Sequence, residues 1–268
     1  MNYRRAANLD EATALLAQYP EAQLLCGSTD AALQLRHAPQ TTVLIDIHTL
    51  EELRGISVEG DYMRIGALVT LNELLRSDVV RASLPLLAAC TETFGSHQIR
   101  NLATVGGNIA NASPAADLTA ALVALEATVT LTSQDGERSV PLETLFCGYR
   151  CTKLDHELIT AVTVPLQTGS WYYRKAGTRE RLNIAKVSIA LTHGHGGFRI
   201  SGASLGPNPV RFRTLEALLD GGVYDDAAIK AALESDTDPS GGFRSTQAYR
   251  LRVAFNMIKE ALSQPEER

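Results

Sequence analysis

The stretch Ala103-Thr104-Val105-Gly106-Gly107-Asn108-Ile109 places two adjacent glycines in apolar surroundings. Adjacent glycines cost backbone entropy on folding, so they indicate that another group comes close to the backbone. That group is either a neighbouring element of the protein or a bound ligand, and these residues favour neither. The sequence Ser-Pro-Ala-Ala-Asp follows at 113–117. Asp117 needs a partner if it is buried, such as a sugar hydroxyl or the N–H of a helix start.

A second stretch of small residues lies upstream, Leu24-Leu25-Cys26-Gly27-Ser28-Thr29-Asp30. Its pattern predicts a short buried strand that passes through a tight turn into a helix. Small side chains let a ligand approach the backbone, and successive N–H groups in such a turn suit an anion such as a pyrophosphate. Purely structural junctions between a strand and a helix have the same composition, so the stretch alone does not establish a site.

The expected fold class is α+β, in three parts. Residues 1–55 alternate short strands with helices, which predicts a small parallel sheet. Residues 56–168 mix strands, helices and a hairpin that turns at Gln134-Asp135-Gly136. Residues 169–268 are expected to form a three-stranded antiparallel sheet with helices. The expected helices lie at 12–19, 31–36, 71–75, 84–94, 118–125, 215–219, 226–233 and 246–262, and the strands at 22–26, 43–47, 62–69, 128–132, 138–141, 158–164, 171–175, 185–193 and 198–205.

Composition and charge exclude several classes of protein. The formal net charge is -5, which leaves no basic footprint for nucleic acid or for an anionic membrane. The sequence shows neither a signal peptide nor an unbroken apolar span, so a cytoplasmic location is expected. The six histidines lack the spacing of metal ligands. All four cysteines are expected to be free thiols: Cys26, Cys90, Cys147 and Cys151.

Common catalytic and nucleotide-binding motifs are missing from the sequence. It contains no Gly-x-Gly-x-x-Gly after a strand, no Walker A lysine and no Gly-x-Ser-x-Gly elbow. No acid–base or nucleophile arrangement is evident, so no catalytic residue and no metal site are assigned. The absence of a nucleophile fits a protein whose chemistry belongs to a bound cofactor.

Taken in order, these stretches resemble the FAD-binding subunit or domain of molybdenum hydroxylases, the family of xanthine dehydrogenase and carbon monoxide dehydrogenase. The resemblance rests on residues 27–30, 98–108 and 113–117. Nearly the whole chain is covered, because later segments resemble the family too: Phe146-Cys147-Gly148-Tyr149-Arg150, Ile184-Ala185-Lys186-Val187, Phe243-Arg244-Ser245 and Tyr249-Arg250. Ser28 departs from the family, which often has a second glycine there.

The resemblance implies a two-part FAD-binding fold of the vanillyl-alcohol-oxidase type, followed by a C-terminal antiparallel sheet and helical bundle. FAD would lie between the first two parts. Residues 23–30 would wrap the pyrophosphate with backbone N–H groups, and residues 103–108 would clamp the pyrophosphate and ribityl chain. Asp117 would bond the sugar-like portion of the flavin, Leu158 would contact the adenine or ring region, and Lys186 would stabilise negative charge on the reduced flavin. The implied cofactor-binding residues are Gln23, Leu24, Leu25, Cys26, Gly27, Ser28, Thr29, Asp30, Ala103, Thr104, Val105, Gly106, Gly107, Asn108, Asp117, Leu158 and Lys186.

The resemblance also implies an activity and partners. The chain would be an oxidoreductase subunit that passes electrons from [2Fe-2S] clusters through FAD to an acceptor such as NAD+ or a quinone. Its partners would be a molybdopterin-binding large subunit and a [2Fe-2S] small subunit, in a heterotrimer or its dimer. The alternative is a stand-alone FAD-dependent oxidoreductase of the same superfamily, for which the sequence shows no acid–base residue. A non-catalytic interaction protein that has lost FAD is disfavoured by the intact Gly106-Gly107-Asn108 and Asp117.

Overall fold

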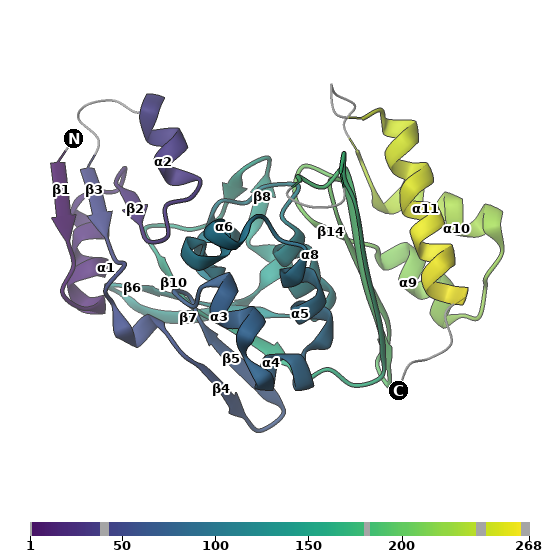
Figure 1. Cartoon of the computed structure of the whole chain (residues 1–268), viewed down its shortest axis with the longest axis horizontal. Coiled ribbons are helices and arrows are strands. Elements are labelled where there is room, and N and C mark those ends of the chain that lie inside the picture. The colour runs from purple at the N-terminus through teal and green to yellow at the C-terminus, as the bar shows by residue number, and fades with distance from the viewer. Residues whose placement is uncertain (1, 38–42, 180–182, 240–244, 264–268) are drawn as a thin grey trace.

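The computed structural model describes residues 2–37, 43–179, 183–239 and 245–263. Its N-terminal part is a small parallel sheet, at the left of Figure 1. The strand order is β1 (Asn2–Arg5), β3 (Val43–Asp46) and β2 (Gln23–Leu25). Helix α1 (Leu9–Gln18) packs against it and begins at Asn8, whose side chain accepts the N–H of Glu11 at 2.8 Å. The predicted parallel sheet is therefore confirmed.

Strand β1 carries no pattern from which it could be predicted. Its four side chains are all exposed, so hydrophobic residues do not alternate along it. Parallel pairing with β3 holds it in place, together with a hydrogen bond from the Tyr3 hydroxyl to Asp46. The strand therefore depends on a distant partner, since Tyr3 and Asp46 are separated by 43 positions in the sequence.

The central part is built on a five-stranded antiparallel sheet. Its order is β4 (Ile56–Glu59), β5 (Tyr62–Gly66), β10 (Leu158–Pro165), β6 (Thr128–Ser133) and β7 (Gly136–Pro141). The predicted hairpin joins β6 to β7. The helices of this part are α3 (Leu71–Arg76), α4 (Asp78–Ser83), α5 (Pro85–Glu92), α6 (His97–Leu102), α7 (Val105–Ala110) and α8 (Asp117–Ala124). In the N-terminal part, the short helix α2 (Ala31–Gln34) and the 3-10 turn η1 (Leu35–His37) follow β2. Two further 3-10 turns are η2 (Glu51–Leu53), before β4, and η3 (Leu142–Thr144), after β7.

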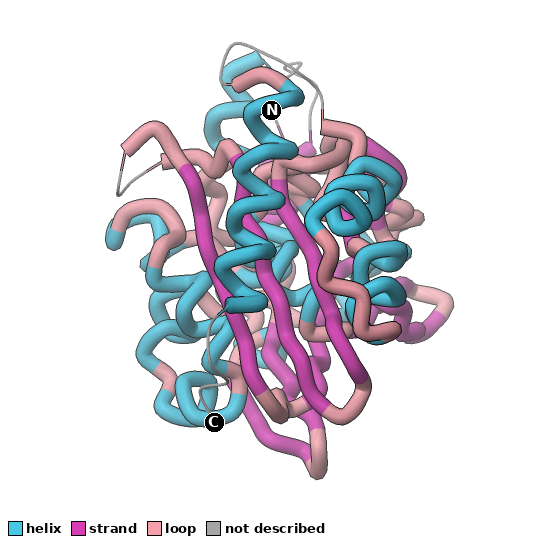
Figure 2. The backbone as a smooth tube through the Cα atoms, turned by 90° about the vertical axis from the view of Figure 1, so that its right-hand side faces the viewer, coloured by secondary structure: helices cyan, strands magenta, loops and turns pink. Residues whose placement is uncertain are grey.

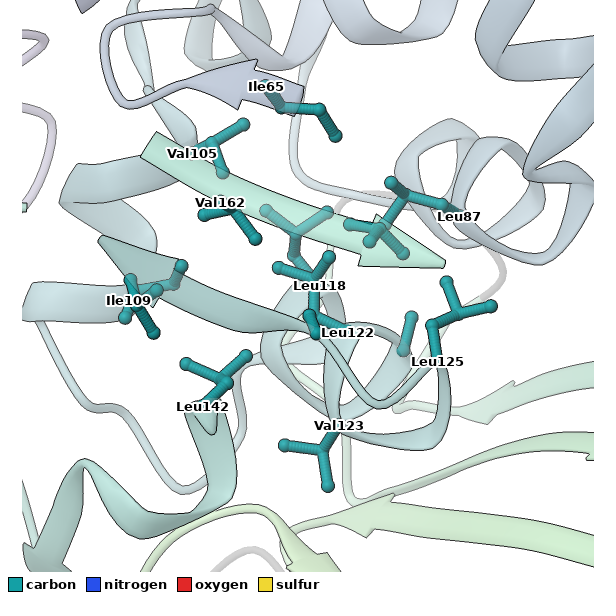
Figure 3. Close-up of a cluster of buried hydrophobic side chains, with 14 of the residues drawn as sticks. Ile65, Leu87, Val105, Ile109, Leu118, Leu122, Val123, Leu125, Leu142 and Val162 are labelled. Atoms are coloured by element: carbon teal, nitrogen blue, oxygen red, sulfur yellow. The ribbon is translucent and has the colours of Figure 1, made fainter. Parts of the chain in front are cut away.

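Helix α8 lies at the centre of the main hydrophobic core, which is shown in Figure 3. All its residues are buried, because α5 and η3 lie on one side and the C-terminal sheet on the other. Leu118 and Leu122 are fully buried and pack with Val162 of β10. Burying one such side chain contributes roughly 1.5–3 kcal/mol. The unbroken apolar pattern at 118–125 is explained by this burial on every face.

The C-terminal part is a four-stranded antiparallel sheet covered on its outer face by helices (Figure 2). Its strands are β11 (Ser170–Ala176), β12 (Val187–Gly194), β13 (Gly197–Ala203) and β14 (Val210–Arg211), and its helices are α9 (Arg213–Asp220), α10 (Asp226–Asp236) and α11 (Gln247–Ser263). The prediction of three strands was wrong by one, because β14 has only two residues and leaves no periodic signal. Within the described ranges, no helix combines the length and apolar character needed to cross a membrane.

The prediction of four free thiols was wrong for two of the cysteines. Cys147 and Cys151 form a disulfide across the small hairpin of β8 (Phe146–Gly148) and β9 (Cys151–Thr152). The hairpin turns so tightly that the two Cα atoms lie 5.2 Å apart, which is within bridging distance. Cys26 and Cys90 are free.

Candidate functional site

A cavity of about 560 Å³ lies between the N-terminal part and the central part. Three segments distant in sequence form its walls: the turn after β2, the start of α7 and the start of β10. More than half of the lining residues are glycine or apolar, and the others carry polar or charged side chains. A cavity of this size with a largely apolar lining and polar groups within it is typical of sites for small molecules and cofactors.

The cavity brings together most of the predicted cofactor-binding residues. The predicted residues that line it are Gln23, Leu24, Cys26, Gly27, Ser28, Thr29, Asp30, Ala103, Thr104, Gly106, Gly107, Asn108 and Leu158. Leu25, Val105, Asp117 and Lys186 do not line it. Leu25 follows Leu24 on a strand, where successive side chains point to opposite faces. Val105 is 1% exposed and belongs to the main core.

The turn after β2 presents a row of backbone donors. Within the described residues, the N–H groups of residues 27–31 have no hydrogen-bond acceptor. Ser28 adopts a left-handed conformation with φ 53°, as residues in anion-binding turns of successive N–H groups commonly do. Unpaired N–H groups in such a turn form a site for an anion. The structure thus supports the anion-binding interpretation of this stretch over the purely structural one.

Gly27 allows two walls of the cavity to touch. A Cβ atom at this position would lie 1.8 Å from the carbonyl oxygen of Leu102, at the end of α6. The obstacle is a backbone atom, which cannot rotate away as the end of a side chain can. Glycine is therefore required here by close approach, whatever the ligand.

Gly106 and Gly107 are surrounded differently, so the lack of a side chain has a different explanation at each position. A Cβ at Gly106 would lie 2.8 Å from Cβ of Ala67, so a neighbouring element explains this glycine. A Cβ at Gly107 would lie 2.8 Å from the Thr104 hydroxyl oxygen and 3.4 Å from Sγ of Cys26, and Gly107 lines the cavity. A neighbouring element therefore explains Gly106, whereas Gly107 faces the cavity, where a ligand could approach its backbone.

Residues 103–109 offer the cavity side chains and the space beside Gly107, and few free backbone N–H groups. Their glycines form the first turn of α7, and the N–H groups there already have acceptors. Val105 N donates to Val69 O at 3.0 Å, and Gly106 N donates to Ala67 O at 2.8 Å. Gly107 N donates to the Thr104 hydroxyl at 3.1 Å. The polar groups that this stretch offers are therefore the side chains of Thr104 and Asn108.

Two charged side chains at the cavity, those of Arg150 and Glu157, were not among the predicted site residues. Arg150 is the sole cation among the described residues that line it. Its guanidinium donates to Oδ1 of Asn111 at 3.0 Å, and the amide nitrogen of Asn111 donates to Oδ2 of Asp30 at 3.1 Å. Arg150 was noted only as part of a family-like segment, and Asn111 carries no sequence signal. Their proximity arises from three segments that meet only in the folded chain.

Glu157 lines the cavity and is held by Arg138 on β7. Nε of Arg138 donates to Oε1 of Glu157 at 2.5 Å, and Nη2 of Arg138 donates to Oε2 at 2.7 Å. The hydrogen bonds from Arg138 lower the pKa of Glu157, although partial burial opposes the shift. Glu157 therefore stays ionised to lower pH than an ordinary glutamate.

Replacing Arg138 with glutamine is expected to lower the melting temperature slightly at neutral pH and not at all in acid. Because the pKa of Glu157 is lowered in the folded state, the pair stabilises fully above the ordinary value of 4.5. The stabilisation is lost as the pH falls through the lower, folded-state pKa. The effect is small because Arg138 is half exposed and water screens the pair. Thermal unfolding of both proteins across this pH range checks it, and a difference that persists in strong acid contradicts it.

Asp117 lies outside the cavity, in a buried pair with Lys175 of β11. Nζ of Lys175 is 2.5 Å from Oδ2, and the two side chains are 7% and 4% exposed. Oδ1 of Asp117 has no hydrogen-bond partner among the described residues. Burial raises the pKa of Asp117, and the charge of Lys175 opposes this shift. The contact of Asp117 with FAD thus stays a prediction.

Lys186 also lies outside the cavity. Its Nζ is 5.4 Å from the centroid of the Tyr249 ring, on helix α11, within the range of a cation–π contact. The contact ties the segment before β12 to α11. The role of Lys186 towards the flavin stays a prediction.

Known protein families match almost the full chain. Residues 1–167 match the FAD binding domain in molybdopterin dehydrogenase, and residues 171–264 match the CO dehydrogenase flavoprotein C-terminal domain. The first match contains the cavity, and the second contains the C-terminal sheet and helices.

Individual relatives agree with these matches. The chain is 32% identical to the xanthine dehydrogenase FAD-binding subunit of Escherichia coli O157:H7, over 98% of this chain and 95% of the relative. It is 33% identical to the carbon monoxide dehydrogenase medium chain of Hydrogenophaga pseudoflava, over 97% and 95%. A solved structure of carbon monoxide dehydrogenase from Hydrogenophaga pseudoflava superposes with a TM-score of 0.90 at 33% identity, covering 98% and 96% of the chains. The chain therefore belongs to the molybdenum hydroxylase family as an FAD-binding medium subunit of the xanthine dehydrogenase and carbon monoxide dehydrogenase type.

Proposed function

We propose that FAD lies in the cavity between the N-terminal and central parts. The observation that carries this proposal is the row of unpaired N–H groups at residues 27–31, which suits the pyrophosphate of FAD. The carboxylates of Asp30 and Glu157 offer acceptors for sugar hydroxyls, and Leu158 offers apolar contact. Arg150 supplies a positive charge close to the anionic pyrophosphate site. The residues present therefore fit the cofactor.

We propose further that this chain is the electron-relay stage of a larger enzyme. FAD, when bound, supplies the redox chemistry, accepting electrons that originate at [2Fe-2S] clusters and releasing them to an acceptor such as NAD+ or a quinone. The partners would be a molybdopterin-binding large subunit and a [2Fe-2S] small subunit. The relatives named as subunits and medium chains support this reading over a stand-alone oxidoreductase. The residues of this chain bind and orient the cofactor and shield it from water.

The finer description of the fold belongs to the same proposal. We assign the chain to the vanillyl-alcohol-oxidase type of FAD-binding fold, with parts at 1–55, 56–168 and 169–268. The three buried hydrophobic clusters support this division, since each is centred on one of the larger sheets. Lys186 and Asp117 are retained as residues proposed to approach the flavin.

Titration of the full chain with FAD tests the proposal. We expect saturable binding of one FAD for each chain. Binding is monitored by the quenching of flavin fluorescence and by the visible absorption of the bound flavin. Purified chain that is colourless and takes up no FAD contradicts the proposed site.

Replacing Gly107 with valine is expected to weaken FAD binding by about tenfold, because branched methyl groups would fill the space between Thr104 and Cys26. Equilibrium titration of the folded variant measures the change. The matched control is Gly196→Ala in the turn between β12 and β13, where a Cβ would meet only the flexible end of Arg199, at 3.3 Å. The control should bind FAD as the wild type does, and equal affinity of the Gly107 variant would remove this glycine from the site.

A further inference from the structure

The hairpin of β8 and β9 carries Arg150 to the cavity on a short, cross-linked tip. The disulfide between Cys147 and Cys151 closes a ring that contains Gly148, Tyr149 and Arg150. Arg150 itself has a left-handed backbone conformation with φ 51°. A non-glycine residue keeps this conformation only where its surroundings impose it. The cross-link therefore restricts the backbone of Arg150, and with it the position of the guanidinium.

Few other contacts hold this tip. The base of the hairpin is anchored, because Leu145 and Phe146 are buried in the main core and Lys153 N donates to Leu145 O at 2.8 Å. Two short strands alone are marginally stable in water, so the tip beyond this base depends on its cross-link. At the tip, Arg150 donates to Asn111, which in turn donates to Asp30 on the opposite wall. The hairpin thus bridges the two walls of the cavity.

The bridge between the cysteines is accessible. Cys147 and Cys151 are both exposed, and Tyr149 between them is 69% exposed. Thiol–disulfide exchange requires that a thiolate reach one of the two sulfurs, and the exposure of both residues places the bridge at the protein surface. The two remaining cysteines differ, since Cys90 is fully buried and Cys26 lines the cavity.

We propose that the Cys147–Cys151 pair is a reversible redox site that controls FAD affinity by fixing or releasing Arg150. The inference rests on the proposed FAD site, because Arg150 acts there. With the disulfide formed, the guanidinium is held beside Asn111 and next to the anionic part of the cofactor. With the disulfide reduced, the tip relaxes, Arg150 leaves the cavity and FAD binds more weakly.

The chemical step is exchange with a dithiol. One thiolate of the dithiol attacks a sulfur of the bridge, breaking the S–S bond and forming a mixed disulfide. Its second thiol then attacks the mixed disulfide, and the reductant leaves as a cyclic disulfide. Two electrons and two protons pass to Cys147 and Cys151, which become thiols. A low-molecular-weight disulfide reverses the reaction by the same exchange.

The experiment compares FAD affinity of the full chain in its two redox states. One sample is treated with oxidised glutathione and the other with dithiothreitol, and each reagent is removed without air before titration. Mass analysis after alkylation of the unfolded chain counts the thiols of the peptide around Tyr149, independently of FAD. We expect reduction to weaken FAD binding about tenfold, the loss of one charge-assisted hydrogen bond.

Two variants separate the disulfide from its proposed effect. Cys147→Ser with Cys151→Ser should bind FAD as the reduced wild type does, and should not respond to either reagent. Arg150→Met should bind weakly in both redox states, because the group through which the disulfide acts is gone. A wild type that binds FAD equally well in both states overturns the inference, as do thiols that stay free after treatment with oxidised glutathione. Absence of FAD binding in either state instead overturns the proposed site itself.

Discussion

Replacing Gly27 with alanine is expected to weaken FAD binding by at least about 100-fold, which is about 2.7 kcal/mol. The added Cβ would lie 1.8 Å from the carbonyl oxygen of Leu102, far inside contact distance. Neither the turn after β2 nor the end of α6 can accept it without moving its backbone. The walls of the cavity must then separate, and the N–H groups at residues 27–31 leave the geometry that suits a pyrophosphate.

The neighbouring residue gives a matched control for this variant. Ser28 has φ 53°, a conformation that glycine adopts without strain, so Ser28→Gly should bind FAD close to wild-type affinity. Titration with FAD measures both variants, and thermal unfolding without FAD shows whether each is folded. A folded Gly27→Ala variant that binds FAD as tightly as the wild type would show that the two walls need not touch.

Replacing Asp117 with alanine is expected to reduce the free energy of unfolding by about 3–5 kcal/mol. Lys175 would keep a positive charge on a side chain that is 7% exposed, with no carboxylate beside it. Removal of one partner of a buried pair costs more than the pair contributes, because the remaining charge is left desolvated. Urea unfolding of the two proteins at neutral pH measures the difference.

A double variant tests this reason. Asp117→Ala with Lys175→Met removes both charges and should recover most of the stability lost by the single variant. Asp226→Ala is the control for an exposed pair, since Asp226 and Lys259 are 58% and 41% exposed, and it should change stability little. A double variant that is no more stable than the single one would contradict the role of the uncompensated charge. The FAD affinity of the folded double variant also reports whether Asp117 reaches the cofactor.

Local sequence determined most of the regular elements. Asn8 and Thr70 cap the helices that the sequence predicts at 12–19 and 71–75, and such signals are local because a cap acts on N–H groups only two or three residues away. The turn at Gln134-Asp135-Gly136 joins its two strands for the same reason. The small residues at 27–30 and 106–107 likewise marked places where atoms of other residues come close to the backbone. Each of these signals is contained within a few neighbouring residues.

The partners of those residues were decided by the tertiary structure alone. A Cβ at Gly27 would meet a backbone atom of Leu102. Asp117 of α8 pairs with Lys175 of the C-terminal sheet. Arg150 is connected to Asp30 through the side chain of Asn111. Strand β1 likewise exists only because β3 pairs with it.

The disulfide shows the same limit at short range. Cys147 and Cys151 are separated by 4 in sequence, yet the spacing alone does not state whether the chain turns back between them. The physical reason is common to all these cases. Propensities, caps and hydrophobic periods act between neighbours in the chain, whereas a cavity, a buried ion pair and a cross-link depend on which distant segments pack together. The sequence of this protein thus determined most of its elements and many of the residues that line the cavity, and the packing of distant segments decided what faces them.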